Sequence, residues 1–309
     1  MKISVIIPIY NGEHYIPACL SCLQKQTYLD WEAVCVNDGS TDNSERILLG
    51  YKHLDPRIRL ISQVNQGVAR ARESGVSEAS GDYITFLDID DTLKENALEI
   101  LEREVQEYPG IGIIVAGLNI ISDGKSRKGR AVGFKKLDSL SFLKRVLHGE
   151  NSWELCGKMY RKDLFIPEVK VPENIRIGED IAVFVQLISR VDMIIGCEYS
   201  IYNYIQHSTS VSHIQSVKLA EETLEAACFI EKYLKQQKKY ENLKNDIGSM
   251  FLLFYSNSTR RAILGRSHPL IRYIRKHHWH LKAFIHLPWL KAMYVLMNYY
   301  LGVSIRLLK

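Results

Sequence analysis

The feature that most constrains the fold is the alternation of apolar runs with helical segments along the first 120 residues. The apolar runs are rich in β-branched residues and have the length of buried strands; they span residues 3–10, 31–38, 57–62, 81–91 and 112–121. Helical spacing separates them, at residues 13–26, 40–51, 67–79 and 94–108. This alternation predicts an α/β fold with a Rossmann-like, mostly parallel sheet and helices on both faces.

Polar residues follow three of these predicted strands. Tyr10 and Asn11 end the first strand, Asp38 ends the second, and residues 88–91 end the fourth. In open parallel sheets, ligands bind beyond the carboxyl ends of strands, near the point where strand order reverses. We therefore expect these side chains to form one binding site.

The carboxylates at the end of the fourth strand need a positive partner. Asp88, Asp90 and Asp91 flank only Ile89. Like charges at this range repel by an amount on the order of 1 kcal/mol in water, and by more when they are partly buried. A divalent cation removes that cost, and hard oxygen ligands favour Mn²⁺ or Mg²⁺. The alternative is that Asp91 or Thr92 caps the following helix.

Five segments together resemble a known family. They read, in order, "VIIPIYNG", "VNDGSTDNS", "NQGVARARESG", "GDYITFLDIDD" and "GEDIAVFVQLI". The chain resembles the family 2 glycosyltransferases with the GT-A fold, over residues 3 to about 210. The resemblance implies an inverting, metal-dependent hexosyltransferase of bacterial surface polysaccharide synthesis. Such an enzyme moves a sugar from a nucleotide-diphosphate sugar, here a UDP-sugar, to a hydroxyl of a glycan or lipid-linked acceptor.

The resemblance assigns the first two segments to the nucleotide. Pro8, Tyr10 and Asn11 stand where family members hold the base. Asp38 would accept a hydrogen bond from the imide N–H of that base, a task that suits an ionised carboxylate.

The next two segments would hold the diphosphate, the sugar and the metal. Arg72 falls at the arginine of the family motif and would approach the base or the diphosphate, with Arg70 as the alternative because Glu73 replaces a common Asn. Asp88 would touch the ribose or the donor sugar. Asp90 would bind the Mn²⁺ or Mg²⁺ on the diphosphate.

The last segments would supply the base and a further ligand. Asp180, in Gly178-Glu179-Asp180, matches the aspartate that deprotonates the acceptor hydroxyl in this family. Acidic residues also favour helix N-termini, so capping is the competing interpretation. His207, in "YNYIQHSTSVS", would reach the metal or the diphosphate.

Charge and composition divide the chain at about residue 215. Residues 216–309 hold 16 Lys and Arg against 6 Asp and Glu, and no acidic residue follows Asp246. Their pattern is helical, with breaks at Pro269 and Pro288. We expect a GT-A catalytic domain at residues 1–215 and a basic, aromatic-rich helical extension at residues 216–309.

The extension has the character of a segment that binds a membrane surface. Its longest uncharged stretch, residues 292–305, has 14 residues, whereas a spanning helix needs about 20. Trp289 and its aromatic neighbours would lie at the boundary, with Lys and Arg toward anionic headgroups. Because the first apolar run contains Pro8 and lacks a cleavage site, we expect a cytoplasmic enzyme, peripheral on the inner face of the membrane. The alternative is packing on the catalytic domain or on a second copy in a homodimer.

Two other classes of protein are less consistent with the sequence. A nucleotidyltransferase also combines an α/β sheet with a carboxylate-bound metal, but it carries a Gly-rich, basic signature near the first strand, where this chain has "PIYNGEHY". A nucleic-acid-binding protein would use the basic tail. The chain contains no recognised motif for nucleic acid, and residues 1–215 carry a net charge of −5, so we expect no nucleic-acid partner.

Overall fold

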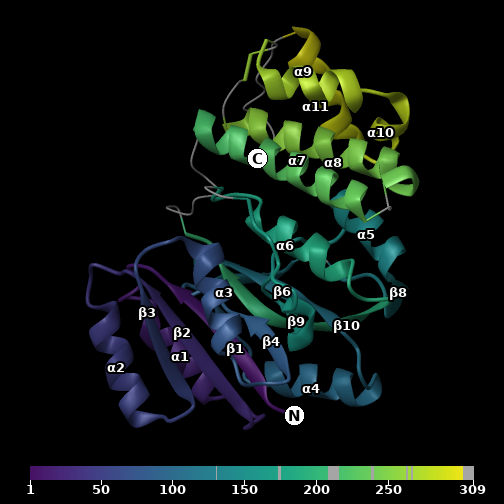
Figure 1. The fold of residues 1–309 in the computed structure, drawn as a ribbon. Helices are drawn as coiled ribbons and strands as arrows, with labels where there is room; N and C mark the ends of the chain where they lie inside the picture. Colours follow the sequence, from purple (N-terminus) through teal and green to yellow (C-terminus); the bar gives the residue numbers. More distant parts are fainter. Residues whose placement is uncertain are drawn as a thin grey trace. The chain divides into compact units, whose positions relative to one another are not determined.

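The computed structural model (Figure 1) describes residues 1–129, 131–172, 175–207, 216–237, 240–261, 264–265 and 267–301. The chain forms two compact units. The first comprises residues 1–139, 154–169 and 187–207 and holds the sheet; the second comprises residues 140–153, 170–186 and the described residues from 216 on, and is helical.

The first unit is built on one ten-stranded sheet. Its order is β3-β2-β1-β4-β9-β6-β10-β5, with β7 beside β6 and β8 beside β10. The strands are β1 (Ile3–Ile9), β2 (Trp31–Asp38), β3 (Ile58–Gln63), β4 (Tyr83–Phe86), β5 (Thr92–Leu93), β6 (Ile113–Ser122), β7 (Lys125–Lys128), β8 (Lys136–Asp138), β9 (Lys158–Arg161) and β10 (Met193–Ile205). Parallel pairing joins β3, β2, β1 and β4, and also β6 and β10.

Helices connect the parallel strands and pack on the sheet (Figure 1). They are α1 (Ile16–Gln24), α2 (Ser44–Leu54), α3 (Val68–Glu78) and α4 (Ala97–Glu107). The connections from β1 to β2 and from β2 to β3 cross the sheet in one direction, and the connection from β3 to β4 crosses it in the opposite direction. Right-handed crossovers therefore place α1 and α2 on one face of the sheet and α3 on the other. α3 lies so close to β1 that a Cβ at Gly75 would stand 2.4 Å from the Ile6 side chain. The predicted α/β sheet is confirmed.

Burial explains why the first two strands are continuous apolar runs. Every residue of β1 and β2 is buried, so both strands are covered on both faces. Glu32, a buried acid of β2, accepts hydrogen bonds from Ser4 Oγ at 2.6 Å and from the Ser80 N–H at 2.6 Å. Burial raises the pKa of Glu32, but bonds from Ser4, Ser80 and Lys2 outweigh it and lower the pKa to about 2.

The differences from the expected strands include an early end of β4 and several strands that were not expected, among them β9. β4 ends at Phe86, whereas the expected strand continued to residue 91, because the chain turns there with the Asp91 N–H donating to the Asp88 carbonyl. β9 was not expected as a strand. It lies antiparallel between β4 and β6 and joins the two parallel parts of the sheet.

The second unit consists of helices. They are α5 (Ser139–Leu147) and α6 (Glu179–Ile188), which belong mainly to this unit, and α7 (Val217–Gln236), α8 (Tyr240–Arg261), α9 (Pro269–His277), α10 (Leu281–Ile285) and α11 (Trp289–Leu301). α7, α9, α10 and α11 all pack against α8. The expected breaks are confirmed, since α9 begins at Pro269 and α11 directly follows Pro288.

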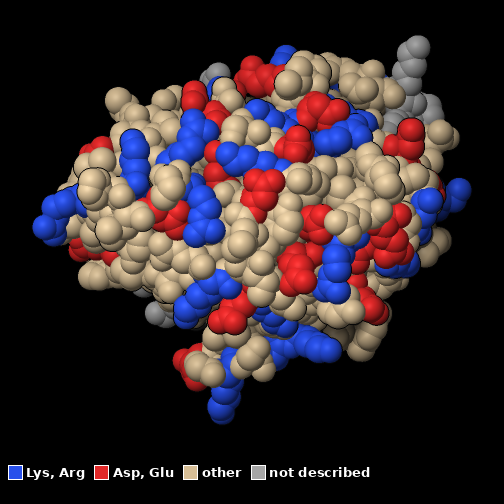
Figure 2. Space-filling model, turned by 90° about the horizontal axis from the view of Figure 1, so that it is seen from below, with Lys and Arg blue, Asp and Glu red and all other residues tan. Residues whose placement is uncertain are grey.

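Two surface properties bear on partners. Within the described part of the chain, no helix combines the length and the apolar character needed to cross a membrane. Lys and Arg side chains are interspersed with Asp and Glu over the face that Figure 2 shows.

Candidate active site

The candidate site lies at the carboxyl edge of the sheet, where strand order reverses. Because β2 lies on one side of β1 and β4 on the other, the ends of these three strands surround the switch point. Tyr10 and Asn11 follow β1, Asp38 is the last residue of β2, and Asp88 comes two residues after β4. The sheet therefore brings together the positions that the sequence predicted from strand ends.

The turn after β1 is tied to the turn after β2. Asn11 adopts a left-handed backbone, with φ of 51°, and its Oδ1 accepts the Thr41 N–H at 2.8 Å. The Asn11 N–H donates to Ser40 Oγ at 3.0 Å. Tyr10 is exposed on this edge, whereas Pro8 is buried within β1. Asn11 thus shapes the edge, and Tyr10 offers it an accessible ring.

Asp38 holds the segment that leads into α3. Its Oδ1 accepts from Gln63 Nε2 at 2.8 Å and from the Gln66 N–H at 2.9 Å, and its Oδ2 accepts from the Gly67 N–H at 2.8 Å. An ionised carboxylate offers about four acceptor positions. One acceptor position on Oδ2 therefore has no partner among the described residues, and Asp38 itself is buried.

Arg72 and Asp88 form an ion pair at the same edge. Arg72, on α3, donates from Nη2 to Asp88 Oδ1 at 2.9 Å. The Arg72 side chain is 8% exposed and that of Asp88 is 37% exposed, so the carboxylate faces outward from a buried guanidinium. Arg70 points elsewhere and pairs with Glu73 at 2.6 Å. Of the two arginines, Arg72 is the one that reaches the carboxylates.

Asp90 and His207 interact electrostatically at this edge. Burial raises the pKa of Asp90, and the neighbouring charge of Asp88 raises it further, while His207 acts in the opposite direction. The His207 ring packs 5.2 Å from the Tyr15 ring, centroid to centroid. Its Nε2 is buried and has no hydrogen-bond partner among the residues that the structure describes. The same edge thus holds a carboxylate that is costly to ionise and a buried ring nitrogen that has no hydrogen-bond partner among the described residues.

Asp91 has a different role, because it anchors the carboxylate loop to β10. Tyr202 Oη donates to Asp91 Oδ2 at 2.6 Å, and the Ile205 N–H donates to Asp91 Oδ1 at 2.7 Å. Burial raises the pKa of Asp91 to about 8, although both of these bonds lower it. The Asp88 N–H donates in turn to Tyr202 Oη at 3.3 Å. The capping alternative is wrong, since Asn96 is the N-cap of α4.

Tyr202 and Tyr15 were not predicted from the sequence as residues of this site. Tyr202 lies five positions before His207, in the same segment "YNYIQHSTSVS", so its closeness in sequence to His207 was a usable signal. Tyr15 gave no signal of this kind, because it reaches His207 only through the folded sheet edge.

We predict that Tyr202→Phe destabilises the first unit. The substitution keeps the buried ring but leaves Asp91 Oδ2 and the Asp88 N–H without their partner, which costs about 1–3 kcal/mol in the free energy of unfolding. Urea unfolding would measure the loss, with Tyr199→Phe as the matched control on an exposed residue of the same strand. Equal stabilities of the two variants would contradict this role.

Asp180 lies in the first turn of α6, in the second unit. Gly178 precedes it with φ of +96°, and a Cβ there would stand 2.5 Å from the Ala226 Cβ, so the position requires glycine. The Arg176 N–H donates to Glu222 at 2.9 Å and fixes the loop on α7. The loop and α7 therefore hold Asp180 at a helix N-terminus. Its role as the base stays a prediction.

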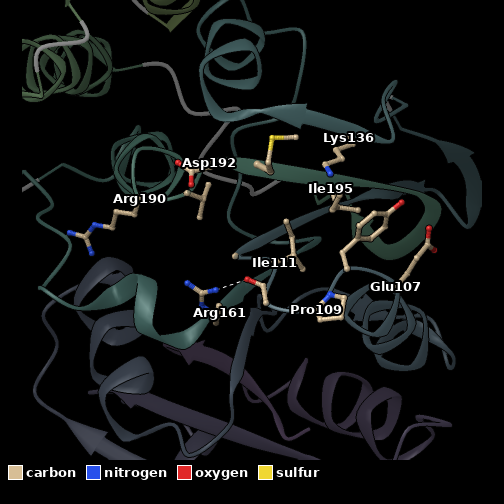
Figure 3. A pocket seen from close by; sticks show the side chains of 13 residues that line it. Glu107, Pro109, Ile111, Lys136, Arg161, Arg190, Asp192 and Ile195 are labelled. Atoms are coloured by element: carbon tan, nitrogen blue, oxygen red, sulfur yellow. Dashed lines mark hydrogen bonds between the residues drawn. The ribbon is translucent and has the colours of Figure 1, made fainter.

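A pocket of about 460 Å³ lies at the opposite edge of the sheet (Figure 3). Its lining includes residues 110–112, which lead into β6, and Val191, Asp192, Met193 and Ile195, around the start of β10. β4 runs parallel to β6, because both are antiparallel to β9, so Asp88 and the pocket lie at opposite ends of these strands. Both arginines that line the pocket already have hydrogen-bond partners: Arg161 donates to Asp163, and Arg190 donates to the Leu164 carbonyl. This pocket is therefore not the candidate site.

The fold and the strand-end carboxylates define the class of protein. The arrangement of the sheet, with helices flanking it and a C-terminal helical extension, is the GT-A fold of glycosyltransferases. A family model described as "Glycosyl transferase family 2" matches residues 4–165, which is more than half of the chain. The chain belongs to glycosyl transferase family 2.

One curated relative and two solved structures illustrate the similarity. The glycosyltransferase GlyG of Streptococcus pneumoniae is 46% identical over 106 residues, which are 34% of this chain and 35% of GlyG, so the chain spans about a third of that relative's length. The structure of S. aureus TarS 1–349 in complex with UDP-GlcNAc has a TM-score of 0.66 at 18% identity, covering 99% of this chain and 93% of that one. The mannosyltransferase PcManGT from Pyrobaculum calidifontis, in complex with GDP-Man and Mn²⁺, has a TM-score of 0.56 at 15% identity, covering 97% and 84%.

Proposed function

We propose that the protein is an inverting glycosyltransferase of surface polysaccharide synthesis. It would move a sugar from a nucleotide-diphosphate sugar, a UDP-sugar, to a hydroxyl of a glycan or lipid-linked acceptor. The observation that carries this proposal is the gathering of Asp38, the Arg72–Asp88 pair and Asp90 at the switch point of a family 2 fold. The nucleotide sugars in the TarS and PcManGT complexes, UDP-GlcNAc and GDP-Man, support the class of donor.

The nucleotide would lie along the ends of β1 and β2. Tyr10 offers an exposed ring for the base, and Asn11 and Pro8 shape the turn beneath it. Asp38 would accept the imide N–H through its remaining position on Oδ2. Asp88, held by Arg72, would accept hydroxyl groups of the ribose or donor sugar, and the guanidinium would also attract the diphosphate.

The residues near Asp90 fit a bound Mn²⁺ or Mg²⁺. Asp90 supplies a hard oxygen donor whose ionised form is disfavoured by burial and by Asp88, and His207 supplies a buried nitrogen with no partner among the described residues. When bound, the metal would supply positive charge for the leaving diphosphate. Asp90 and His207 would hold it, while Asp91 and Tyr202 keep their loop in place.

Asp180 would be the base. A single displacement needs one carboxylate that accepts the proton of the acceptor hydroxyl as the sugar is transferred. Its place in the first turn of α6, behind a glycine that cannot be replaced without a clash, supports a fixed position for the carboxylate.

A donor panel tests this function. The full chain would be incubated with Mn²⁺ and UDP-, GDP- and dTDP-sugars, and release of the nucleoside diphosphate would be measured. We expect release from one UDP-sugar that depends on the divalent cation. Release of pyrophosphate from a nucleoside triphosphate in place of this reaction would favour a nucleotidyltransferase.

We also propose that the extension binds the inner face of the cell membrane. α9 to α11 pack on α8 through one face, where Ile271, Ile274 and Val295 are buried. α10 and α11 also carry exposed large apolar residues: Leu281, Ile285, Trp289, Leu290, Met293, Leu296 and Tyr300. We call these seven residues the apolar face. Together with a segment that is basic throughout, it favours insertion into an anionic leaflet.

Ile285→Ser combined with Trp289→Ser should release the protein from anionic vesicles. Burying each of these side chains contributes about 1.5–3 kcal/mol, so membrane partitioning should fall at least about tenfold. Vesicle sedimentation would measure it, and UDP binding should be retained. Leu54→Ser, which changes an exposed leucine of α2, is the matched control. A wild-type dimer that becomes a monomer in the variant, with no vesicle binding by either, would assign the apolar face to a second copy of the chain.

A further inference from the structure

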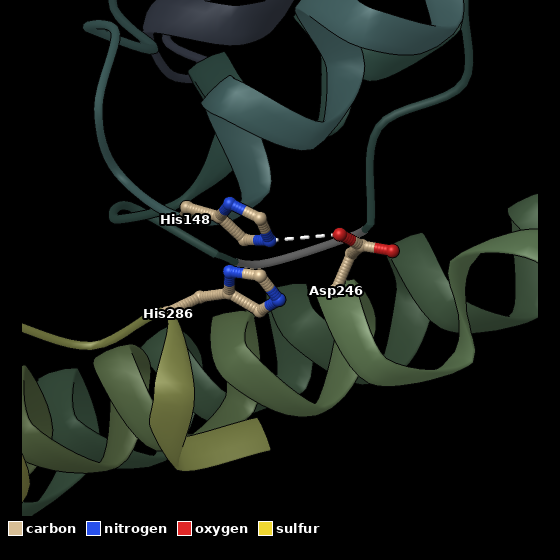
Figure 4. Close-up of side chains that lie close together, drawn as sticks. All are labelled: His148, Asp246 and His286. Carbon is tan, nitrogen blue, oxygen red and sulfur yellow. Dashed lines mark hydrogen bonds and ion pairs between the residues drawn. The ribbon is translucent and has the colours of Figure 1, made fainter. Parts of the chain in front are cut away.

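Three potential metal ligands meet in the second unit, far from one another in the sequence (Figure 4). His148 directly follows α5, Asp246 lies on α8, and His286 directly follows α10. His148 Nε2 is 2.8 Å from Asp246 Oδ1, and the His148 and His286 rings stack with centroids 4.1 Å apart. One ligand atom from each residue lies within 4.8 Å of the other two.

The surroundings of these side chains are typical of a metal site. The side chains of His148 and Asp246 are 7% and 9% exposed, and His286 is open to solvent, which gives an ion a path of entry. Glu150 Oε1 lies 3.5 Å from the other ring nitrogen of His148. Metal-binding histidines commonly donate their second N–H to a carboxylate, which orients the ring. His148 is thus placed between an inner carboxylate and an outer one.

We propose that His148, Asp246 and His286 bind a Zn²⁺-like transition metal ion that ties three segments of the helical unit together. Two imidazoles and one carboxylate are a donor set that suits Zn²⁺, with water in the fourth position. Tetrahedral ligands at Zn²⁺ lie roughly 3.3 Å apart, because the bonds are about 2.0–2.2 Å long. Binding therefore requires the stacked rings to tilt, and the exposed His286 ring has the room to do so.

The ion would fix the turn between α10 and α11 onto α8. His286 lies between Ile285 and Trp289 of the apolar face, so the ion would set the position of that face. This site is separate from the Asp90 site in ligand chemistry, being rich in imidazole, and it does not rest on the proposed sugar transfer.

The test uses full-length protein without a polyhistidine tag, freed of metal with a chelator and titrated with Zn²⁺ by calorimetry. Asp90→Ala is used as the background, so that the candidate active site does not contribute. We expect one Zn²⁺ per chain and, at about a hundredfold excess over Kd, a rise in the melting temperature of roughly 5 °C. Co²⁺ in place of Zn²⁺ should give the visible absorption of a four-coordinate site.

Two variants and one control decide the assignment. His286→Ala changes an exposed residue, and Asp246→Asn keeps the shape and the contact with His148; each should weaken Zn²⁺ binding at least about tenfold and abolish the Co²⁺ absorption. His53→Ala, an exposed histidine of α2, should change neither. Binding should also be lost below about pH 6, where imidazoles protonate. No Zn²⁺ binding at micromolar concentration, or binding that His286→Ala and Asp246→Asn leave unchanged, would overturn the proposal.

Discussion

Asp90→Ala should abolish sugar transfer and the Mn²⁺-dependent part of UDP binding. A metal that neutralises a leaving diphosphate contributes several kcal/mol to the transition state, so turnover should fall by at least about 10³-fold. The fold should persist, because the charged form of this carboxylate is disfavoured by burial and by Asp88. Removing it relieves that repulsion, and the metal-free variant should be at least as stable as the wild type.

Calorimetry with UDP, in Mn²⁺ and then in chelator, measures the effect. Glu95→Ala is the matched control, since Glu95 is an exposed acid five residues further on, in the turn between β5 and α4. The control should bind UDP as the wild type does and should lose the same affinity in chelator. Equal UDP binding by the wild type with and without chelator would contradict the metal role of Asp90.

The strands that could be predicted well from the sequence are those that are buried on both faces and therefore have a recognisable apolar, β-branched composition. β2 matches its predicted range and β1 matches to within a residue, because strands covered on both faces select continuous apolar, β-branched residues. The sequence of β9 does not have this composition. Its four residues, Lys158 to Arg161, include a lysine that is 1% exposed and show neither alternation nor a β-branched run. Only the pairing with β4 and β6 makes them a strand.

The same distinction applies to the candidate site. Parallel strands gather their carboxyl ends at one edge, so Asp38 and Asp88 could be placed near each other from the strand pattern alone. The contacts that shape the site join residues far apart in the chain: Tyr202 and Asp91 are 111 positions apart. Likewise, His148 and Asp246 are 98 positions apart. No short motif contains such pairs, and they exist only once the units have folded.

Asp180→Asn should lower turnover by roughly 10²–10⁴-fold while leaving donor affinity nearly unchanged. Asparagine keeps the shape and most hydrogen bonds of aspartate, but it cannot take the acceptor's proton, and a positioned base typically contributes this much. The donor residues Asp38, Arg72 and Asp88 all belong to the first unit, which the substitution does not touch. UDP binding in Mn²⁺ and the rate of transfer, measured on the same preparation, would separate the two effects.

Glu179→Gln is the matched control for this substitution, because Glu179 and Asp180 both lie in the first turn of α6. The negative charges of both residues interact favourably with the helix dipole at its N-terminus. Removing either charge should therefore lower the free energy of unfolding by a similar, small amount, about 0.3–1 kcal/mol. Only the proton acceptor should lose turnover. If Asp180→Asn retains most of its activity and Glu179→Gln loses it, the base is Glu179. If neither loses it, both carboxylates serve the helix N-terminus, and the acceptor's proton leaves by another route.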